Sequence, residues 1–393
     1  MSSLTYRTAG ESHGPALLAV IEGMPAGVPV DQHLIDTELR RRQGGYGRGG
    51  RQKIETDLVQ ILSGVRRGKT IASPIALEVI NKDSRLDDAP ALHRPRPGHA
   101  DLAGSIKWLT TDCRETLERA SARETAARVA AGALTRSLLK EFNISVFAYV
   151  LSIGSVIAKI DWSKPLPELL ALRDKGDLFK EWVGCPDEAA STKMRNEIQG
   201  AKQTGDTLGG LVECRVFGCP PGLGTCVHYD QKLDARLAMA VMGTQAFKAV
   251  EIGMGKDVAF LPGSKVHDEI GFDPSLKGTH TLGFIRKTNN AGGLEGGMTN
   301  GQTSIVRGAK KPISTLGKPL ESVDLNTKQP DKAAYERSDA CAVPAASVIL
   351  ENIVAFEIAR ALVEKFGGDS LIEMKANYEN FLSLARRLPL DEQ

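Results

Sequence analysis

Three long segments with apolar residues on most sides constrain the fold of this chain most strongly. Residues 343–366 have a proline in their first turn and stop before Gly367 and Gly368, as a helix favours. Residues 121–142 and 233–253 have a similar, alanine-rich helical pattern. Helices that are apolar over wide faces are buried. We therefore predict that these three helices lie inside the fold, with sheets outside them.

Shorter apolar segments predict the strands of those sheets. Residues 56–65 and 73–80 have the apolar and β-branched composition of strands. In residues 210–218, apolar side chains alternate with Glu213 and Arg215, as is typical of a half-buried antiparallel strand. The sequence therefore predicts the α+β class, with helices packed between antiparallel β-sheets.

The chain shows no clear linker and no convincing internal repeat. Its 393 residues, 41% of them hydrophobic, are enough for a large core. We expect a single domain over residues 1–393, with a flexible C-terminal tail from about residue 380. Residues 289–302 are too rich in glycine for regular structure, so they either turn tightly or let the backbone approach a ligand.

A cationic run stands out in a chain whose formal net charge is only +2. Residues 40–53, RRRQGGYGRGGRQK, place six cationic side chains among glycines. Asp31 is suited to cap a helix over residues 32–43 that Gly44 ends, which puts three arginines in its last turn. Such a run either binds nucleic acid as a flexible arm or closes as a folded loop on a small phosphorylated ligand.

Composition excludes several other classes of protein. The N-terminus has no signal peptide, and no apolar stretch approaches the roughly 20 residues of a membrane span. Six cysteines without a CxxC pair fit a reducing compartment, so we expect a cytoplasmic protein. Cys219, Cys226 and His228 are too few for a zinc site, and we predict no metal.

Residues 63–70, SGVRRGKT, superficially resemble a nucleotide-binding P-loop. Ser63 stands where that motif needs its first glycine, and the residues that follow contain Pro74 and a β-branched run instead of a helix. We interpret this segment as a hairpin turn.

Five further segments combine glycine or proline with cations, histidine or hydroxyl groups. They are AGESHG (9–14), HRPRPGHAD (93–101), LERASARETAAR (117–128), KKPIST (310–315) and ERSDACAVP (336–344). Each has an ordinary structural explanation when taken alone, such as a turn, a solvated surface, an ion pair or a helix cap. Together with the run at 40–53, they predict a concave cationic pocket for a small polyanion.

Two of these structural explanations are specific. Arg119 and Arg123 are four residues apart and would share one face at the start of a helix, paired with Glu118 or Glu124. Ser338 or Asp339 would cap the helix that follows them.

The order of seven motifs resembles one family. AGESHG, RRQGGYGRGGR, RPRPGHADL, ERASARETAARVAAGA, GGLEGGMTNGQ, KPIST and RSDACAVPAA stand in the order found in chorismate synthases, from about residue 5 to about residue 370. One departure is the connection at residues 81–93, which looks shorter than in many members and leaves the nearby subunit contacts open.

The resemblance implies a reaction and a cofactor. The family converts 5-enolpyruvylshikimate 3-phosphate to chorismate and phosphate by a 1,4-trans elimination, and it needs reduced FMN although there is no net redox change. It also implies a β-α-β sandwich fold and a homotetramer. Some members reduce FMN with NADPH, whereas most bacterial members receive it from a separate flavin reductase. Because no extra reductase domain follows residue 370, we favour the monofunctional type.

The resemblance also implies residue roles. His13 corresponds to the histidine that protonates the departing phosphate, and His99 to the one near the flavin ring. Asp339 corresponds to the aspartate that helps flavin N5 accept the C6 proton. Arg42 and Arg48 match arginines that contact the substrate phosphate or NADPH. The flavin positions correspond to Arg119, Ala120, Ser121, Gln245, Ala246, Gly296, Lys311, Pro312, Ile313, Ser314, Thr315 and Arg337.

Two alternatives explain part of the pattern. A nucleic-acid-binding protein would use residues 40–53, but Tyr46 is the only aromatic residue there and the net charge gives no broad basic face. An oxidoreductase with net electron transfer would also bind FMN, but no GxGxxG motif joins a strand to a helix. We therefore expect neither nucleic acid nor a membrane as a partner.

Overall fold

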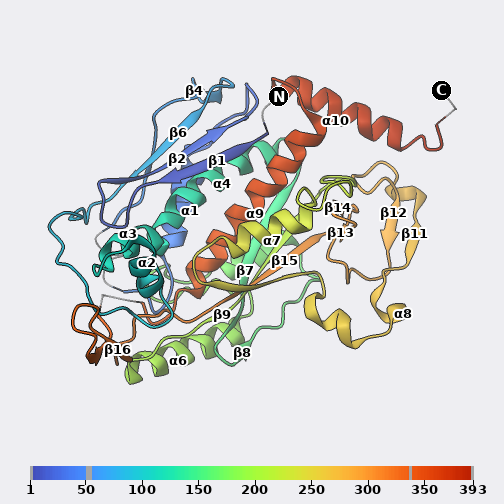
Figure 1. Ribbon diagram of the computed structural model, residues 1–393. Coiled ribbons are helices and arrows are strands. Elements are labelled where there is room, and N and C mark those ends of the chain that lie inside the picture. Colours follow the sequence, from blue (N-terminus) through green and yellow to red (C-terminus); the bar gives the residue numbers. More distant parts are fainter. Residues whose placement is uncertain (1–2, 50–54, 336–338, 391–393) are drawn as a thin grey trace.

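The computed structural model describes residues 3–49, 55–335 and 339–390 and shows helices between two sheets (Figure 1). The first sheet has the order β1 (Thr5–Ala9), β2 (Ala16–Glu22), β6 (Ile75–Ile80) and β3 (Val59–Ile61). The second has the order β10 (Phe247–Ile252), β15 (Ser304–Lys310), β9 (Gly210–Phe217), β7 (Ser145–Ile153) and β8 (Val156–Ile157). All neighbouring strands in both sheets are antiparallel.

Two long helices fill the space between the sheets. Helix α4 (Thr125–Lys140) packs against β2 and β6, and α9 (Val343–Phe366) packs against β7 and β9. The two helices also pack closely against each other, with α1 (Gln32–Gln43) beside both. Almost every residue of α9 is buried, as its apolar pattern predicts. The predicted α+β class is therefore confirmed, and two of the three helices predicted to be internal, α4 and α9, lie inside the fold.

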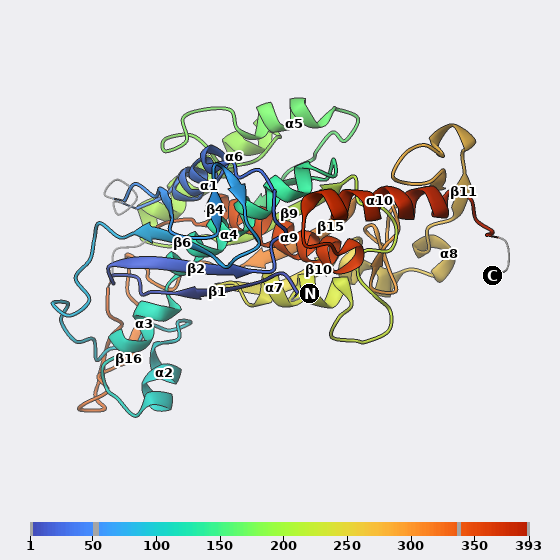
Figure 2. The ribbon, with the colours of Figure 1, turned by 90° about the horizontal axis from the view of Figure 1, so that it is seen from above.

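Further elements surround the central helices and sheets, and some of them lie at the two ends of the sandwich. Figure 2 shows α2 and β16 at one end, and α8 and β11 at the other. These elements are β4 (Val65–Arg66), β5 (Lys69–Thr70), α2 (Asp101–Trp108), α3 (Arg114–Ala120), α5 (Leu166–Arg173), α6 (Glu188–Thr204), α7 (Leu233–Met242), α8 (Gly263–Val266), β11 (Ile270–Phe272), β12 (Phe284–Arg286), β13 (Leu294–Glu295), β14 (Met298–Thr299), β16 (Glu321–Val323), β17 (Pro330–Lys332) and α10 (Leu371–Ala385).

Several local predictions are confirmed. Asp31 caps α1 by accepting a hydrogen bond from the backbone N–H of Leu34, and α1 ends at Gly44. Residues 63–70 form a β-hairpin, in which β4 pairs with β5. Residues 75–80 and 210–217 are strands.

The helix predicted over residues 233–253 is wrong in its second half. Helix α7 stops at Met242, and after a short turn the chain continues as β10, which pairs with β15. Ala246 in that turn has a left-handed φ of 70°. Residues 247–252 form backbone hydrogen bonds with β15 instead of continuing the helix. This pairing depends on a strand that is distant in the sequence, so the local pattern does not reveal it.

Other boundaries differ more modestly. The helix predicted from residue 121 starts at Thr125, after a 3-10 turn over Ala122–Glu124. Of the strand predicted over 56–65, only β3 and the first residue of β4 are in strands. Residues 289–302 contain the short hairpin of β13 and β14, although we expected no regular structure. Helix α10 continues to Ala385, beyond the residue where the flexible tail was expected.

Glu213 is also an exception to the alternation of its strand. Its side chain is buried, although the pattern placed it on the solvent face. The hydroxyl of Tyr149 donates to it at 2.6 Å, and Arg215 and Arg307 form ion pairs with it. These partners compensate for the burial of its charge.

Glycine permits the close packing of α4 on α9. A Cβ built at Gly132 would lie 2.1 Å from the carbonyl oxygen of Asn352. A side chain at this position would therefore force the two central helices apart.

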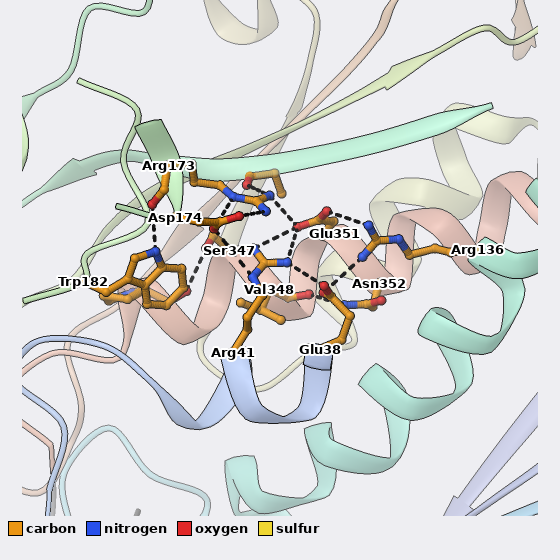
Figure 3. Close-up of polar contacts among 12 residues, drawn as sticks. Glu38, Arg41, Arg136, Arg173, Asp174, Trp182, Ser347, Val348, Glu351 and Asn352 are labelled. Atoms are coloured by element: carbon orange, nitrogen blue, oxygen red, sulfur yellow. Dashed lines mark hydrogen bonds and ion pairs between the residues drawn. The ribbon is translucent and has the colours of Figure 1, made fainter. Parts of the chain in front are cut away.

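A buried network of ion pairs ties the central helices to α5 (Figure 3). Glu351 of α9 contacts Arg41 of α1 at 3.3 Å, Arg136 of α4 at 3.3 Å and Arg173 of α5 at 3.1 Å. Glu38 of α1 contacts Arg41 at 2.7 Å and Arg136 at 3.1 Å. Burial alone would raise the pKa of Glu38, but the two arginines hold it below its usual range.

We expect Gly132→Ala to destabilise the protein and Gly200→Ala to stabilise it. A Cβ at position 132 collides with backbone of α9, whereas a Cβ at the exposed position 200 in α6 meets nothing within 4 Å. Alanine at position 200 should add up to about 1 kcal/mol from helix propensity. Urea unfolding of both variants measures the difference. An equal gain in both would contradict close contact between α4 and α9.

Glu351→Gln should lower the free energy of unfolding by about 3–5 kcal/mol, because it leaves buried arginines short of a carboxylate. Glu269→Gln is the matched control, since its ion pair with Lys287 is fully on the surface. The control should change stability by less than about 0.5 kcal/mol. A small effect of Glu351→Gln in the same urea titration would show that the network is not required for stability.

Candidate active site

The segment that carries His99 lies on the loop at 311–315. The carbonyl oxygen of Gly98 accepts a hydrogen bond from Lys311 Nζ, and Arg96 Nη1 donates to Thr315 Oγ1 at 3.0 Å. His99 Nδ1 contacts Asp101, which also accepts from Arg96 Nε at 2.8 Å. Burial would raise the pKa of Asp101, but hydrogen bonds from His99 and Arg96 hold it well below its usual range. The structure thus brings the loop of His99, through Gly98 and Arg96, together with Lys311 and Thr315.

A second chain of contacts joins Arg119 to Gln245. Arg119 Nη2 donates to Thr8 Oγ1 at 3.0 Å, and Thr8 Oγ1 donates to Glu124 Oε1 at 2.5 Å. Gln245 Nε2 donates to Glu124 Oε2 at 2.9 Å. Ala120 and Ser121 directly follow Arg119, where α3 ends in extended backbone.

Ala246 connects this second group to the first. Its carbonyl oxygen accepts a hydrogen bond from the backbone N–H of Lys311 at 2.9 Å. The predicted flavin positions at 119–121, 245–246 and 311–315 therefore form one connected region.

Arg48 and Asp339 form an ion pair between the glycine-rich loop and the segment before α9. Asp339 also accepts from the backbone N–H of Gly49 at 2.6 Å. It does not cap α9, whose N-cap residue is Ala342 and has no side-chain cap. Ser338, the other predicted cap, and Arg337 lie outside the described residues.

Lys310 lies between these groups at the end of β15. Its side chain is buried, and Nζ donates to the carbonyl oxygen of Gln245 at 3.2 Å. Burial and the nearby cations Arg48 and Arg42 lower its pKa from 10.5 to about 8, although Asp339 acts in the opposite direction. A buried ammonium group beside two arginines favours the binding of an anion.

Arg42 is buried beside this region and is held by internal partners. Its guanidinium donates to Thr125 Oγ1 at 2.9 Å and to the carbonyl oxygen of Ala122 at 3.0 Å, and it pairs with Asp57 at 3.4 Å. Arg123 shares Asp57 at 2.7 Å. The assignment of Arg42 to an external phosphate stays a prediction.

The prediction that Arg119 and Arg123 share one helix face is wrong. Arg119 is in the last turn of α3, whereas Arg123 is in the 3-10 turn beyond an extended Ser121. Their expected ion-pair partners also differ, because Glu118 pairs with His13 and Arg114, and Glu124 pairs with Arg128.

His13 is buried in the turn between β1 and β2, against α3. Its Nδ1 lies 2.9 Å from Glu118 Oε1, and its Nε2 lies 3.7 Å from Asp83. Asn81 connects this turn to Arg123, because its side chain donates to the carbonyl oxygen of Gly14 at 2.8 Å and accepts from Arg123 Nε at 2.8 Å.

Gly296 is not joined to this region by a described contact. It lies in the turn of the β13–β14 hairpin, which packs on Gly224 and on the start of α7. Figure 1 shows this hairpin across α7 and α9 from α2 and α3. Its role in flavin binding stays a prediction.

The donor set of the region fits a flavin mononucleotide. Lys311, Ser314 and Thr315 offer an ammonium group and two hydroxyls, as a phosphate group requires. Within the described part of the chain, the buried Gln245 Oε1 and Arg48 Nε have no hydrogen-bond partner. These atoms are an acceptor and a donor that a bound polar ligand would satisfy.

Sequence reasoning missed the acidic residues that organise the site. Asp101 and Glu118 each lie against a predicted catalytic histidine, and Glu124 links Arg119 to Gln245 through Thr8. Both glutamates were assigned to nearby arginines. The only local signal was the spacing of Asp101, two residues after His99.

The chain is similar to proteins of one family. The family model for chorismate synthase matches residues 4–363. The chain belongs to the chorismate synthase family. The chorismate synthase of Desulforamulus reducens is 52% identical over 98% of this chain and 100% of its own, and that of Pelobacter propionicus is 53% identical over 98% and 100%. A solved crystal structure of a chorismate synthase, 38% identical, superposes with a TM-score of 0.77 over 98% of this chain and 99% of its own.

Chorismate synthases are lyases of the shikimate pathway, and this chain is an enzyme of that class. In the described ranges, no three histidine, cysteine or acidic residues gather as they would around a metal ion. The same residues contain no helix that is both long and apolar enough to span a bilayer.

Lys310→Met should change the pH dependence of stability. Between pH 8 and 10.5, the unfolded chain keeps a proton on Lys310 that the folded chain has lost, so wild-type stability gains there as the pH rises. The variant has no charge to bury at position 310. Its free energy of unfolding should therefore exceed that of wild type by up to about 3 kcal/mol below pH 8, and this difference should become smaller towards pH 10.5.

Thermal unfolding at pH 7, 9 and 10 measures this difference, with the exposed Lys318→Met as control. A difference between Lys310→Met and wild type that does not vary with pH would contradict the lowered pKa of Lys310.

Proposed function

We propose that the protein converts 5-enolpyruvylshikimate 3-phosphate to chorismate and phosphate by a 1,4-trans elimination, with reduced FMN and no net redox change. The observation that carries this proposal is the position of Lys310. Its buried ammonium group lies between Gln245, a flavin position, and the Arg48–Asp339 pair, a substrate position. The substrate has one phosphate and two carboxylates, and FMN adds a phosphate, so both need cations at one place.

His13 is proposed to donate a proton to the departing phosphate. Its imidazole is buried beside a carboxylate, and a histidine suits proton transfer near neutral pH. His99 is proposed to control the protonation of the flavin ring, because its loop packs on the loop at 311–315.

Arg48 and Asp339 are proposed to act together at the substrate. A substrate anion that binds Arg48 competes with the carboxylate of Asp339, which is now its ion-pair partner. Binding would release Asp339, which we propose assists removal of the C6 proton. Arg42 is proposed to contact the substrate phosphate or NADPH. It lies close enough to Lys310 for its charge to help lower the pKa of that lysine.

The flavin is proposed to lie along the connected region described above. When bound, reduced FMN supplies electron density that assists cleavage of the allylic C–O bond. The proposed contacts are Arg119, Ala120, Ser121, Gln245, Ala246, Gly296, Lys311, Pro312, Ile313, Ser314, Thr315 and Arg337. Gly98 has a left-handed φ of 75°, which glycine adopts without strain, and its carbonyl oxygen accepts a hydrogen bond from Lys311 Nζ, so the His99 loop lies against these residues. A closely packed loop excludes water.

A cytoplasmic homotetramer that receives reduced flavin from a separate reductase is the proposed working form. Self-association is supported by large apolar side chains exposed at the end of the molecule that carries α8 and β11. Phe260 is 79% exposed, Ile270 67% and Phe272 51%. Apolar side chains gathered in this way favour burial against another protein surface. NADPH remains an alternative source of electrons.

The first experiment is an anaerobic assay with 5-enolpyruvylshikimate 3-phosphate and dithionite-reduced FMN. We expect chorismate and phosphate in equal amounts, and neither product with oxidised FMN alone. A further arm with oxidised FMN and NADPH tests whether the protein reduces its own flavin. No product from folded protein that binds FMN, with steady NADPH consumption in the absence of substrate, would contradict the proposal and favour an oxidoreductase.

A further inference from the structure

Glu118 of α3 holds His13 at two points. Its Oε2 accepts the backbone N–H of His13 at 2.8 Å, and Nδ1 of the ring lies 2.9 Å from Oε1 and 3.1 Å from Oε2. The side chain of Glu118 is only 2% exposed. One carboxylate therefore fixes both the backbone and the ring of the same residue.

These contacts select one tautomer of the imidazole. Burial would raise the pKa of the Glu118 carboxyl, but hydrogen bonds from His13 and the charge of Arg114 lower it, so the group is ionised. An ionised carboxylate can only accept hydrogen bonds. Nδ1 must therefore carry a proton, and Nε2 is the ring nitrogen that exchanges protons.

No described residue forms a hydrogen bond with Nε2, so this nitrogen can donate to a ligand. Asp83 is the nearest acidic group, at 3.7 Å, which is beyond a hydrogen bond. Asp83 is itself paired with the largely exposed Arg85 at 3.1 Å. Within the described parts of the chain, the charged groups on this side of the ring are Glu118 and Arg114 from α3, and Asp83 and Arg85 from the connection at residues 81–93.

We propose that Glu118 is a positioning residue that keeps the proton on His13 Nδ1, so that Nε2 is the atom that protonates the leaving phosphate. This inference rests on the proposed role of His13. In the step, the Nε2–H bond breaks as a bond forms between that proton and a phosphate oxygen. The ring is left neutral with its proton on Nδ1, and water returns a proton to Nε2 before the next turnover.

A glutamine at position 118 should reverse this arrangement. The backbone N–H of His13 needs an acceptor, so the amide oxygen takes the place of Oε2 and the NH2 group takes the place of Oε1, the atom nearer to Nδ1 and the one that Arg114 Nη1 contacts at 3.3 Å. In this orientation Nδ1 accepts from the NH2 group, which leaves the neutral ring with its proton on Nε2. A neutral ring could donate that proton only by becoming an imidazolate, so proton transfer to phosphate would fail while hydrogen bonding to it persists.

Glu118→Gln should therefore lower kcat about 10²-fold or more with a small change in KM, on the usual scale for a lost acid–base group. Glu115→Gln is the matched control, because Glu115 is an exposed residue of the same helix and should keep wild-type kinetics. Glu118→Asp retains the charge and should recover part of the lost kcat. Wild-type kcat in Glu118→Gln would overturn the proposal.

Nitrogen-15 NMR of histidine-labelled protein tests the tautomer without any substrate. At a pH where His13 is neutral, wild type and Glu115→Gln should show a protonated Nδ1, and Glu118→Gln a protonated Nε2, with signals assigned by their loss in His13→Gln. A protonated Nε2 in wild type would overturn the proposal, even if Glu118→Gln did not fold. The expected tautomers in a protein that forms no chorismate would support the role of Glu118 and reject the proposed reaction.

Discussion

The buried ion pairs around Glu351 are the constraint on which the arrangement of the site depends. Glu351 lies about two turns into α9, the helix that follows Asp339. Its partner Arg41 lies in the last turn of α1, just before the loop of Arg48. Because separating these buried charges from their partners would be costly, the ion pairs fix the position of α1 relative to α9. That position sets where Arg48 meets Asp339.

Pairing of buried charges with groups of opposite charge is also found at the site itself. Each predicted catalytic histidine lies against a carboxylate, and Arg42 and Arg123 share Asp57. Lys310 differs, because its hydrogen bond goes to a neutral carbonyl group. Acidic residues orient most of the basic groups, whereas neutral oxygen atoms hold Lys310, Lys311 and Arg119.

Local signals in the sequence predicted the elements that depend on local chemistry. The cap at Asp31, the stop at Gly44 and the burial of α9 follow from side-chain types and their spacing. The switch from α7 to β10 did not follow, because it depends on a left-handed Ala246 and on pairing with β15. The partners of Glu118 and Glu124 were also missed, since contacts over more than 100 residues are set by packing.

The position of Lys310 has a consequence for the thermodynamics of ligand binding. With a pKa of about 8, this side chain is only partly protonated in weakly alkaline solution. An anion that binds beside it stabilises the protonated form, so binding draws a proton from the buffer. The affinity for that anion then falls as the pH rises, and the heat released on binding includes the ionisation enthalpy of the buffer.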